Sequence, residues 1–203
     1  MTQQTWYYPL GEMRHETKVK GSRFLARLVP IAAEDEAQNA LEQVRKEEHT
    51  ATHNCFAWRI GAGDDEVWRV SDDGEPAGTA GKPIYSVLQG ANLTNTLAVV
   101  TRYFGGTKLG KGGLIRAYSG VVKDCLPELR MKEFIARQLL VCKTDFEHSN
   151  LVYRLVESYG AKILEQSFER DVVVQVQIKK SEADKFAWEL RELSHGLIKA
   201  EFI

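Results

Sequence analysis

The chain has 203 residues, of which 43% are hydrophobic and 27% are charged, and its formal net charge is -1. This composition is typical of a folded protein of one or two domains and excludes a disordered chain. A net charge near zero also excludes a uniformly basic protein, so any affinity for nucleic acid must come from uneven placement of the charges.

The chain shows no signal for secretion or for membrane insertion. No apolar stretch approaches about 18 residues, and residues 1–4 carry no basic patch before an apolar run. Three cysteines without close pairing argue against a disulfide framework and suit a reducing compartment; they are Cys55, Cys125 and Cys142. We therefore expect a cytoplasmic protein that does not bind membranes, in which each cysteine is a small buried residue.

Strands and helices alternate in the first two-thirds of the chain. Ala37, Leu41 and Val44 fall at helical spacing and give one helix its apolar face, and Pro127 ends the regular part of another. The pattern predicts strands over 5–8, 12–20, 23–29, 53–60, 66–70 and 97–104, and helices over 33–48, 83–89 and 113–126.

The last third switches between the strand and helix periods more clearly. It predicts a strand over 138–146, a helix over 148–159, strands over 162–169 and 171–179, a helix that ends before Gly196, and a strand over 197–203. Ser181 and Asp184 have the spacing of a capping box at the start of the second helix. The order β-α-β-β-α-β predicts a ferredoxin-like unit. We expect an α+β protein with domains at 1–133 and 137–203.

No aspartate or glutamate occurs between Pro76 and Lys123, and this segment contains six cations: Lys82, Arg102, Lys108, Lys111, Arg116 and Lys123. Within it, an expected strand leads into a glycine-rich loop that opens an expected helix. The glycines are Gly105, Gly106, Gly110, Gly112 and Gly113. Backbone amides in such a loop and at a helix N-terminus form a site for anions, such as the phosphates of RNA.

Two other interpretations of this loop are open. The glycines are also expected where a tight turn between strand and helix needs unusual backbone angles. The spacing of Gly105, Gly110 and Lys111 approaches that of a nucleotide-binding P-loop, but Gly112 stands where a serine or threonine should bind magnesium. A dinucleotide site fails as well, because Ile115 stands where the third glycine is needed.

An acidic loop precedes the basic segment and contains Asp72, Asp73 and Glu75. Paired carboxylates act as acid and base or bind a cation, but they also cap turns and pair with cations, and we favour this structural role. His49, His53 and Cys55 lack the spacing of a zinc site. We expect no metal and no cofactor.

The segments SDDGEPAGTAGKP (71–83), RYFGG (102–106), LG (109–110), GGL (112–114) and RAY (116–118), with His53 and Cys55 before them, resemble the IMPACT family. The resemblance spans essentially the whole chain. It implies an N-terminal domain of the ribosomal-protein β-α-β type, like domain IV of elongation factor G, and a C-terminal domain like domain V of that factor. It also implies a link to translational control, because eukaryotic relatives act through a ribosome-associated activator of a stress kinase.

Three functions follow as hypotheses. The first is a non-catalytic RNA- or ribosome-binding protein that regulates translation, in which the cations and glycines of 82–116 contact phosphate. The second is an enzyme that acts on a phosphorylated small molecule or nucleotide, with the acidic loop as base or metal ligand. The third is a module that binds a protein partner through the exposed sheet of the C-terminal domain.

Overall fold

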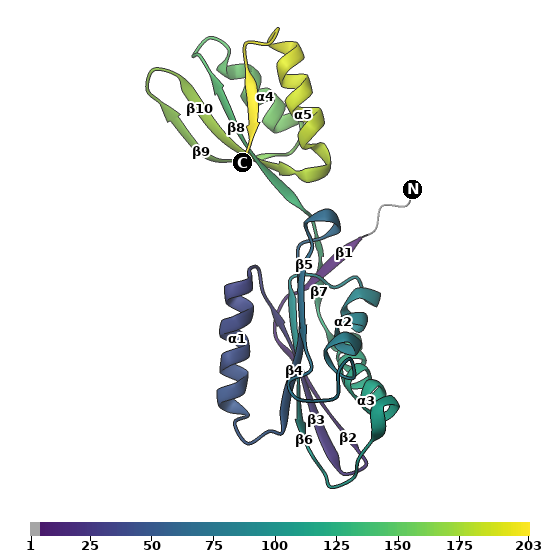
Figure 1. Cartoon of the computed structure of the whole chain (residues 1–203). Helices are drawn as coiled ribbons and strands as arrows, with labels where there is room; N and C mark the ends of the chain where they lie inside the picture. Colours follow the sequence, from purple (N-terminus) through teal and green to yellow (C-terminus); the bar gives the residue numbers. More distant parts are fainter. Residues whose placement is uncertain (1–4) are drawn as a thin grey trace. The chain divides into compact units, whose positions relative to one another are not determined.

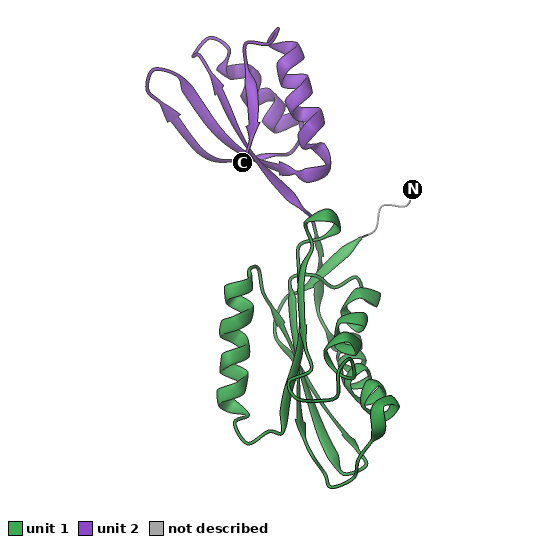
Figure 2. Cartoon of the chain, in the orientation of Figure 1, with its two compact units in different colours: residues 1–134 green, residues 135–203 purple. Residues whose placement is uncertain are grey.

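The computed structural model describes residues 5–203 of the chain, which forms two compact units, Met1–Phe134 and Ile135–Ile203 (Figure 2). Each unit has its own hydrophobic core. In unit 1 the helices are α1 (Glu34–Glu47), α2 (Gly81–Gly90) and α3 (Gly110–Cys125), and the strands are β1 (Trp6–Pro9), β2 (Met13–Val19), β3 (Ser22–Pro30), β4 (His53–Ile60), β5 (Val67–Ser71), β6 (Thr96–Tyr103) and β7 (Met131–Phe134). Every strand and helix expected in this unit is present, within three residues of its expected bounds.

Five strands of unit 1 form an antiparallel sheet in the order β2-β3-β6-β4-β5. Helix α1 covers one face of this sheet, and α2 and α3 cover the other (Figure 1). Leu97 and Val99 of β6 pack with α1, whereas Ala98 and Val100 pack with α2 and α3. A strand that is buried on both faces has a continuous apolar sequence, because neither set of alternate side chains meets water.

Strands β1 and β7 form a separate two-stranded antiparallel sheet, in which Trp6 lies opposite Phe134. The sequence pattern does not predict β7, because a strand of four residues is too short for its alternation to be recognised. Beside this sheet, the buried guanidinium of Arg59 lies 4.7 Å from the centre of the Trp6 ring and pairs with Glu66 at 2.5 Å. Arg59 therefore ties β1 to the large sheet.

Unit 2 contains, in chain order, β8 (Arg137–Thr144), α4 (Ser149–Ser158), β9 (Lys162–Phe168), β10 (Val172–Lys179), α5 (Lys180–Leu193) and β11 (Lys199–Phe202). The predicted order of elements is confirmed. The strands form one antiparallel sheet in the order β11-β8-β10-β9. In β10 the side chains of Val172, Val174 and Val176 are buried, and Gln175 and Gln177 alternate with them on the half-buried face.

Two helix starts differ from those expected. Helix α3 begins at Gly110, three residues before the predicted start, so Gly110 to Gly113 form its first turn and only 104–109 form a loop. The capping box at Ser181 is wrong: α5 follows β10 directly, its N-cap is Lys179, and no side chain caps it. Ser181 is therefore inside the helix. Among residues 5–203, no helix is both long enough and apolar enough to cross a bilayer.

Candidate nucleic-acid interface

Asp72 caps α2 from within the acidic loop. Its carboxylate accepts hydrogen bonds at 2.8, 2.9 and 2.9 Å from the backbone N–H groups of Gly78, Ala80 and Gly81. Burial raises the pKa of this carboxyl, but the three N–H groups and the charge of Lys82 outweigh burial, so the pKa lies below its ordinary value. A negative charge is stabilised at the positive end of a helix dipole. Asp72 thus supplies the anion that the N-terminus of α2 would otherwise take from a ligand.

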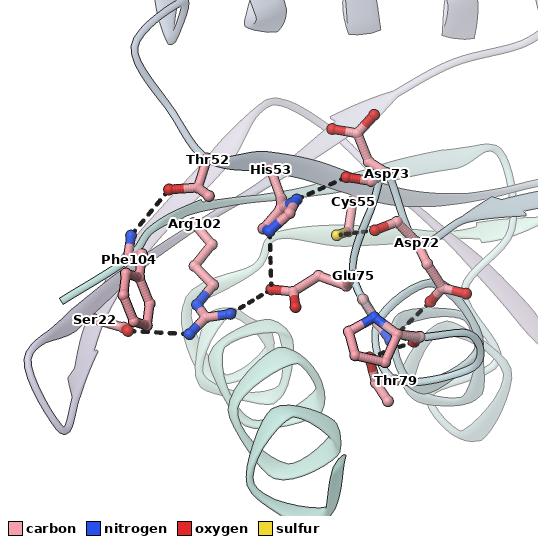
Figure 3. A network of polar contacts seen from close by, with 12 residues as sticks. Ser22, Thr52, His53, Cys55, Asp72, Asp73, Glu75, Thr79, Arg102 and Phe104 are labelled. Carbon is pink, nitrogen blue, oxygen red and sulfur yellow. Dashed lines mark hydrogen bonds and ion pairs between the residues drawn. The ribbon is translucent and has the colours of Figure 1, made fainter. Parts of the chain in front are cut away.

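Arg102 is buried, which corrects the expectation that it contacts phosphate. Its Nη1 donates to Oε1 of Glu75 at 2.6 Å, and its Nη2 donates to Oγ of Ser22 at 3.3 Å (Figure 3). The hydroxyl of Tyr118 donates to the same Glu75 oxygen at 2.8 Å. The side chains of Arg102 and Glu75 are only 7% and 4% exposed. Both members of this ion pair are therefore engaged in holding the acidic loop against the end of β6.

The polar side chains beside this pair are also engaged within the protein. Nδ1 of His53 lies 2.7 Å from the carbonyl oxygen of Asp73, which only accepts, so Nδ1 carries the proton in this contact (Figure 3). The thiol of Cys55 donates to the carbonyl oxygen of Asp72 at 3.0 Å, and burial raises its pKa to about 12. Such a thiol is not a nucleophile near neutral pH. Within the described residues, no group of three or more His, Cys, Asp or Glu side chains is placed to hold a metal ion.

The glycines before α3 and in its first turn have different roles. Gly105 lies against the turn between β2 and β3, where a Cβ would come within 1.9 Å of the carbonyl carbon of Gly21. Gly106 and Gly110 have φ angles of +86° and +69°, which favour glycine. Gly112 has no such constraint, because the nearest atom to a Cβ there is Nη1 of Arg116, 3.6 Å away. The tight-turn interpretation thus explains part of the glycine pattern, and Gly112 and Gly113 lie in the first turn of α3.

The contact between Gly21 and Gly105 joins two segments that are far apart in the sequence. It brings the β2–β3 turn beside the loop 104–109, and both lie at the same end of unit 1 (Figure 1). Exposed cations occur on both segments and on the first two turns of α3. We call this group the basic tip; it consists of Lys18, Lys20, Lys108, Lys111 and Arg116.

No cation of the basic tip forms an ion pair with a carboxylate among residues 5–203. Several arginines elsewhere in unit 1 are paired, for example Arg27 with Glu47 and Arg45 with Asp73. Helix α3 has no acidic residue in its first turn and no side-chain cap. Positive charge at this end of the unit therefore has no ion-pair partner among the described residues.

The acid-free segment of the sequence marks Lys108, Lys111 and Arg116 of this tip but not Lys18 and Lys20. The two lysines lie in the segment 12–20, which also contains Glu12 and Glu16, so no acid-free segment marks them. Lys82 is exposed on the first turn of α2, where its charge acts on Asp72. Only the folding of β2 and β3 against the loop before α3 brings the full set together.

The open face of the sheet in unit 2 differs in character from the basic tip. A groove of about 490 Å³ runs over its end, lined by Val141 and Val173 with Lys143, Lys199 and Glu201 around them. Both signs of charge are present, and no aromatic side chain lines the groove. That a protein partner binds this face stays a prediction.

Fold and surface together define a two-domain α+β protein with a basic tip on its first domain. Residues 20–126 match the family described as Impact N-terminal domain, and residues 142–197 match a domain of unknown function designated DUF1949. The chain belongs to the IMPACT family.

Bacterial members resemble it along nearly their whole length. IMPACT family member YvyE of Bacillus subtilis is 35% identical over 94% of this chain and 88% of its own length. IMPACT family member YigZ of Escherichia coli is 32% identical over 95% of both chains. A crystal structure described as that of a hypothetical protein is 32% identical, with a TM-score of 0.73 over 99% of this chain and 98% of the other.

Similarity to mammalian Protein IMPACT covers less than half of this chain. The human Protein IMPACT is 33% identical over 44% of this chain and 28% of its own length. A structure described as the two-domain translational regulator Yih1 is 23% identical, with a TM-score of 0.41 over 57% of this chain and 47% of the other.

Proposed function

We propose that this chain is a non-catalytic RNA-binding protein that contacts the ribosome and takes part in regulating translation. The observation that carries the proposal is the basic tip, five exposed cations that no carboxylate of the described chain neutralises. Folded proteins commonly pair surface cations with nearby acids or disperse them, whereas phosphate-binding surfaces gather them. A polyanion is the ligand that this arrangement fits best.

The fold supports the ribosomal part of the proposal. The β-α-β-β-α-β order of unit 2 is that of ferredoxin-like domains, as expected for a likeness to domain V of elongation factor G. In unit 1, β3 and β4 are joined by α1 and both pair with β6, which gives the split β-α-β arrangement expected for a likeness to domain IV. These likenesses concern fold alone, and the basic tip concerns the function.

The acidic loop supports a binding role over a catalytic one. A general base or metal ligand needs an oxygen that faces the substrate. Both oxygens of Asp72 accept backbone hydrogen bonds, and Oε1 of Glu75 accepts from both Arg102 and Tyr118. These carboxylates are therefore occupied in holding α2 and β6.

Salt dependence tests the phosphate contacts directly. Each phosphate that a protein neutralises on single-stranded RNA contributes about -0.7 to the slope of log affinity against log salt concentration. The double variant Lys108→Ala, Lys111→Ala should therefore flatten this slope by about 1.4. A matched control removes two exposed lysines of unit 2, Lys162 and Lys199, and should leave the slope unchanged.

Sedimentation of cell extract through a sucrose gradient tests the ribosome contact. We expect the wild-type chain to travel with ribosomes at low salt and to leave them at high salt, and the tip variant to leave at lower salt than the unit 2 control. Migration at the top of the gradient at every salt concentration would overturn the ribosomal part. An affinity for RNA that is indifferent to salt would overturn the role of the basic tip.

A further inference from the structure

Seven large aromatic side chains of the described residues are more than a third exposed. Six of them have a carboxylate within two residues in the sequence or, for Tyr7, opposite in the sheet, and carboxylates repel the phosphates of RNA. The six are Trp68 near Glu66, Phe146 beside Asp145, Phe168 beside Glu169, Trp188 beside Glu189, Phe202 beside Glu201, and Tyr7 opposite Glu133. The exception is Phe104, which lies in the loop of the basic tip, in the segment without acids.

The ring of Phe104 is exposed, and the guanidinium of Arg102 packs against it. Its side chain is 48% exposed, and the guanidinium carbon of Arg102 lies 5.5 Å from the ring centre (Figure 3). Arg102 is fixed in turn by its ion pair with Glu75. The backbone N–H of Phe104 donates to Oγ1 of Thr52 at 3.1 Å, so the backbone is anchored as well. A ring that is positioned before binding loses little conformational freedom when it stacks on a ligand.

The two positions after Phe104 carry no side chain that could cover its ring. Gly105 and Gly106 follow it without side chains, and a Cβ at Gly106 would meet nothing within 4 Å. Lys20 and Lys108 of the basic tip lie on the two segments that meet at Gly105. A flat apolar ring, a bare backbone and unpaired cations are the features that bind a base and the phosphates on either side of it.

We infer that Phe104 stacks on an unpaired base of single-stranded RNA, while the cations of the basic tip contact the flanking phosphates. This inference rests on the proposed RNA binding and names the kind of RNA that is bound. A base inside a duplex is covered on both faces by its neighbours and offers no free face to the ring. The preferred ligand is therefore a loop, a bulge or a single-stranded end.

The test compares two ligands that share the same phosphates. One is a single-stranded RNA of about 12 nucleotides, and the other is an abasic strand of the same length. Binding of the full-length chain is measured by fluorescence anisotropy at one salt concentration. Since stacking contributes about 1–3 kcal/mol per base, wild type should bind the RNA roughly 5- to 150-fold more tightly than the abasic strand.

Variants separate stacking from charge. Phe104→Leu should lose the preference for RNA over the abasic strand, Phe104→Trp should keep it, and the double variant Lys108→Ala, Lys111→Ala should weaken both ligands together. Quenching of 2-aminopurine placed in the RNA supplies a readout on the wild-type chain that needs no substitution. We expect quenching on binding, because a stacked fluorescent base loses emission.

The possible results distinguish this inference from the function on which it rests. Equal affinity of wild type for both strands, with no quenching, overturns the stacking of Phe104 and leaves phosphate binding in place. Failure of wild type to bind either strand overturns the proposed RNA binding itself. Loss of the preference in Phe104→Leu, with its retention in Phe104→Trp, supports the stacked base.

Discussion

Replacing Glu75 by glutamine should destabilise unit 1 strongly. The substitution keeps the shape of the side chain but leaves the guanidinium of Arg102, only 7% exposed, without a counter-charge. Removing one partner of a buried ion pair typically costs about 3–5 kcal/mol, because the remaining charge stays buried and unpaired. With a urea dependence of about 2 kcal/mol per molar, the unfolding midpoint should fall by about 1.5–2.5 M.

Urea unfolding followed by tryptophan fluorescence measures this change, since three of the four tryptophans, Trp6, Trp58 and Trp68, lie in unit 1. Glu47→Gln is the matched control. Glu47 pairs with Arg27 at 2.5 Å, but its side chain is 38% exposed, so the substitution should lower the unfolding midpoint far less than Glu75→Gln does. A loss of under about 1 kcal/mol for Glu75→Gln would refute the reasoning from burial.

Three further predictions concern the same unit and the thiols. Gly105→Ala should destabilise the chain, because the added Cβ would come within 1.9 Å of the backbone of Gly21. Gly112→Ala should stabilise it by about 0.5–1 kcal/mol, because alanine favours a helix more than glycine does. Thermal unfolding should show a lower melting temperature for the first variant and a higher one for the second. Asp72→Asn should lower stability at neutral pH and weaken its pH dependence. Folding lowers the pKa of Asp72, so its contribution to the free energy of unfolding is full above the ordinary carboxyl pKa and is lost as the pH falls through the pKa of the folded state. Identical urea midpoints of variant and wild type between about pH 3 and pH 7 would contradict this. Burial raises the pKa of three thiols, those of Cys55, Cys125 and Cys142, to about 12. A thiol reagent should therefore label them at neutral pH only as fast as the chain unfolds. Rapid labelling in native buffer would show that one of them is accessible.

Local patterns determine most of the elements of this chain. The alternation in β10 predicts its buried and half-buried faces because a strand repeats every two residues, and the spacing of Ala37, Leu41 and Val44 predicts the face that α1 buries. The sequence also marks the loop 104–109 by its glycines and its lack of acids. These features depend on a few consecutive residues, so the sequence alone contains them.

Contacts between distant segments decided the rest. In the sequence, Arg102 is one cation among six in a segment without acids, but the fold buries it against Glu75, which also accepts a hydrogen bond from Tyr118 of α3. Lys18 and Lys20 carry no signal in their own segment, and they join the basic tip because the turn at Gly21 packs on Gly105. Strand β7 forms because it pairs with β1, which lies at the opposite end of the sequence of unit 1. Side-chain type and period are local properties, whereas the burial or pairing of a charge depends on which segments fold together.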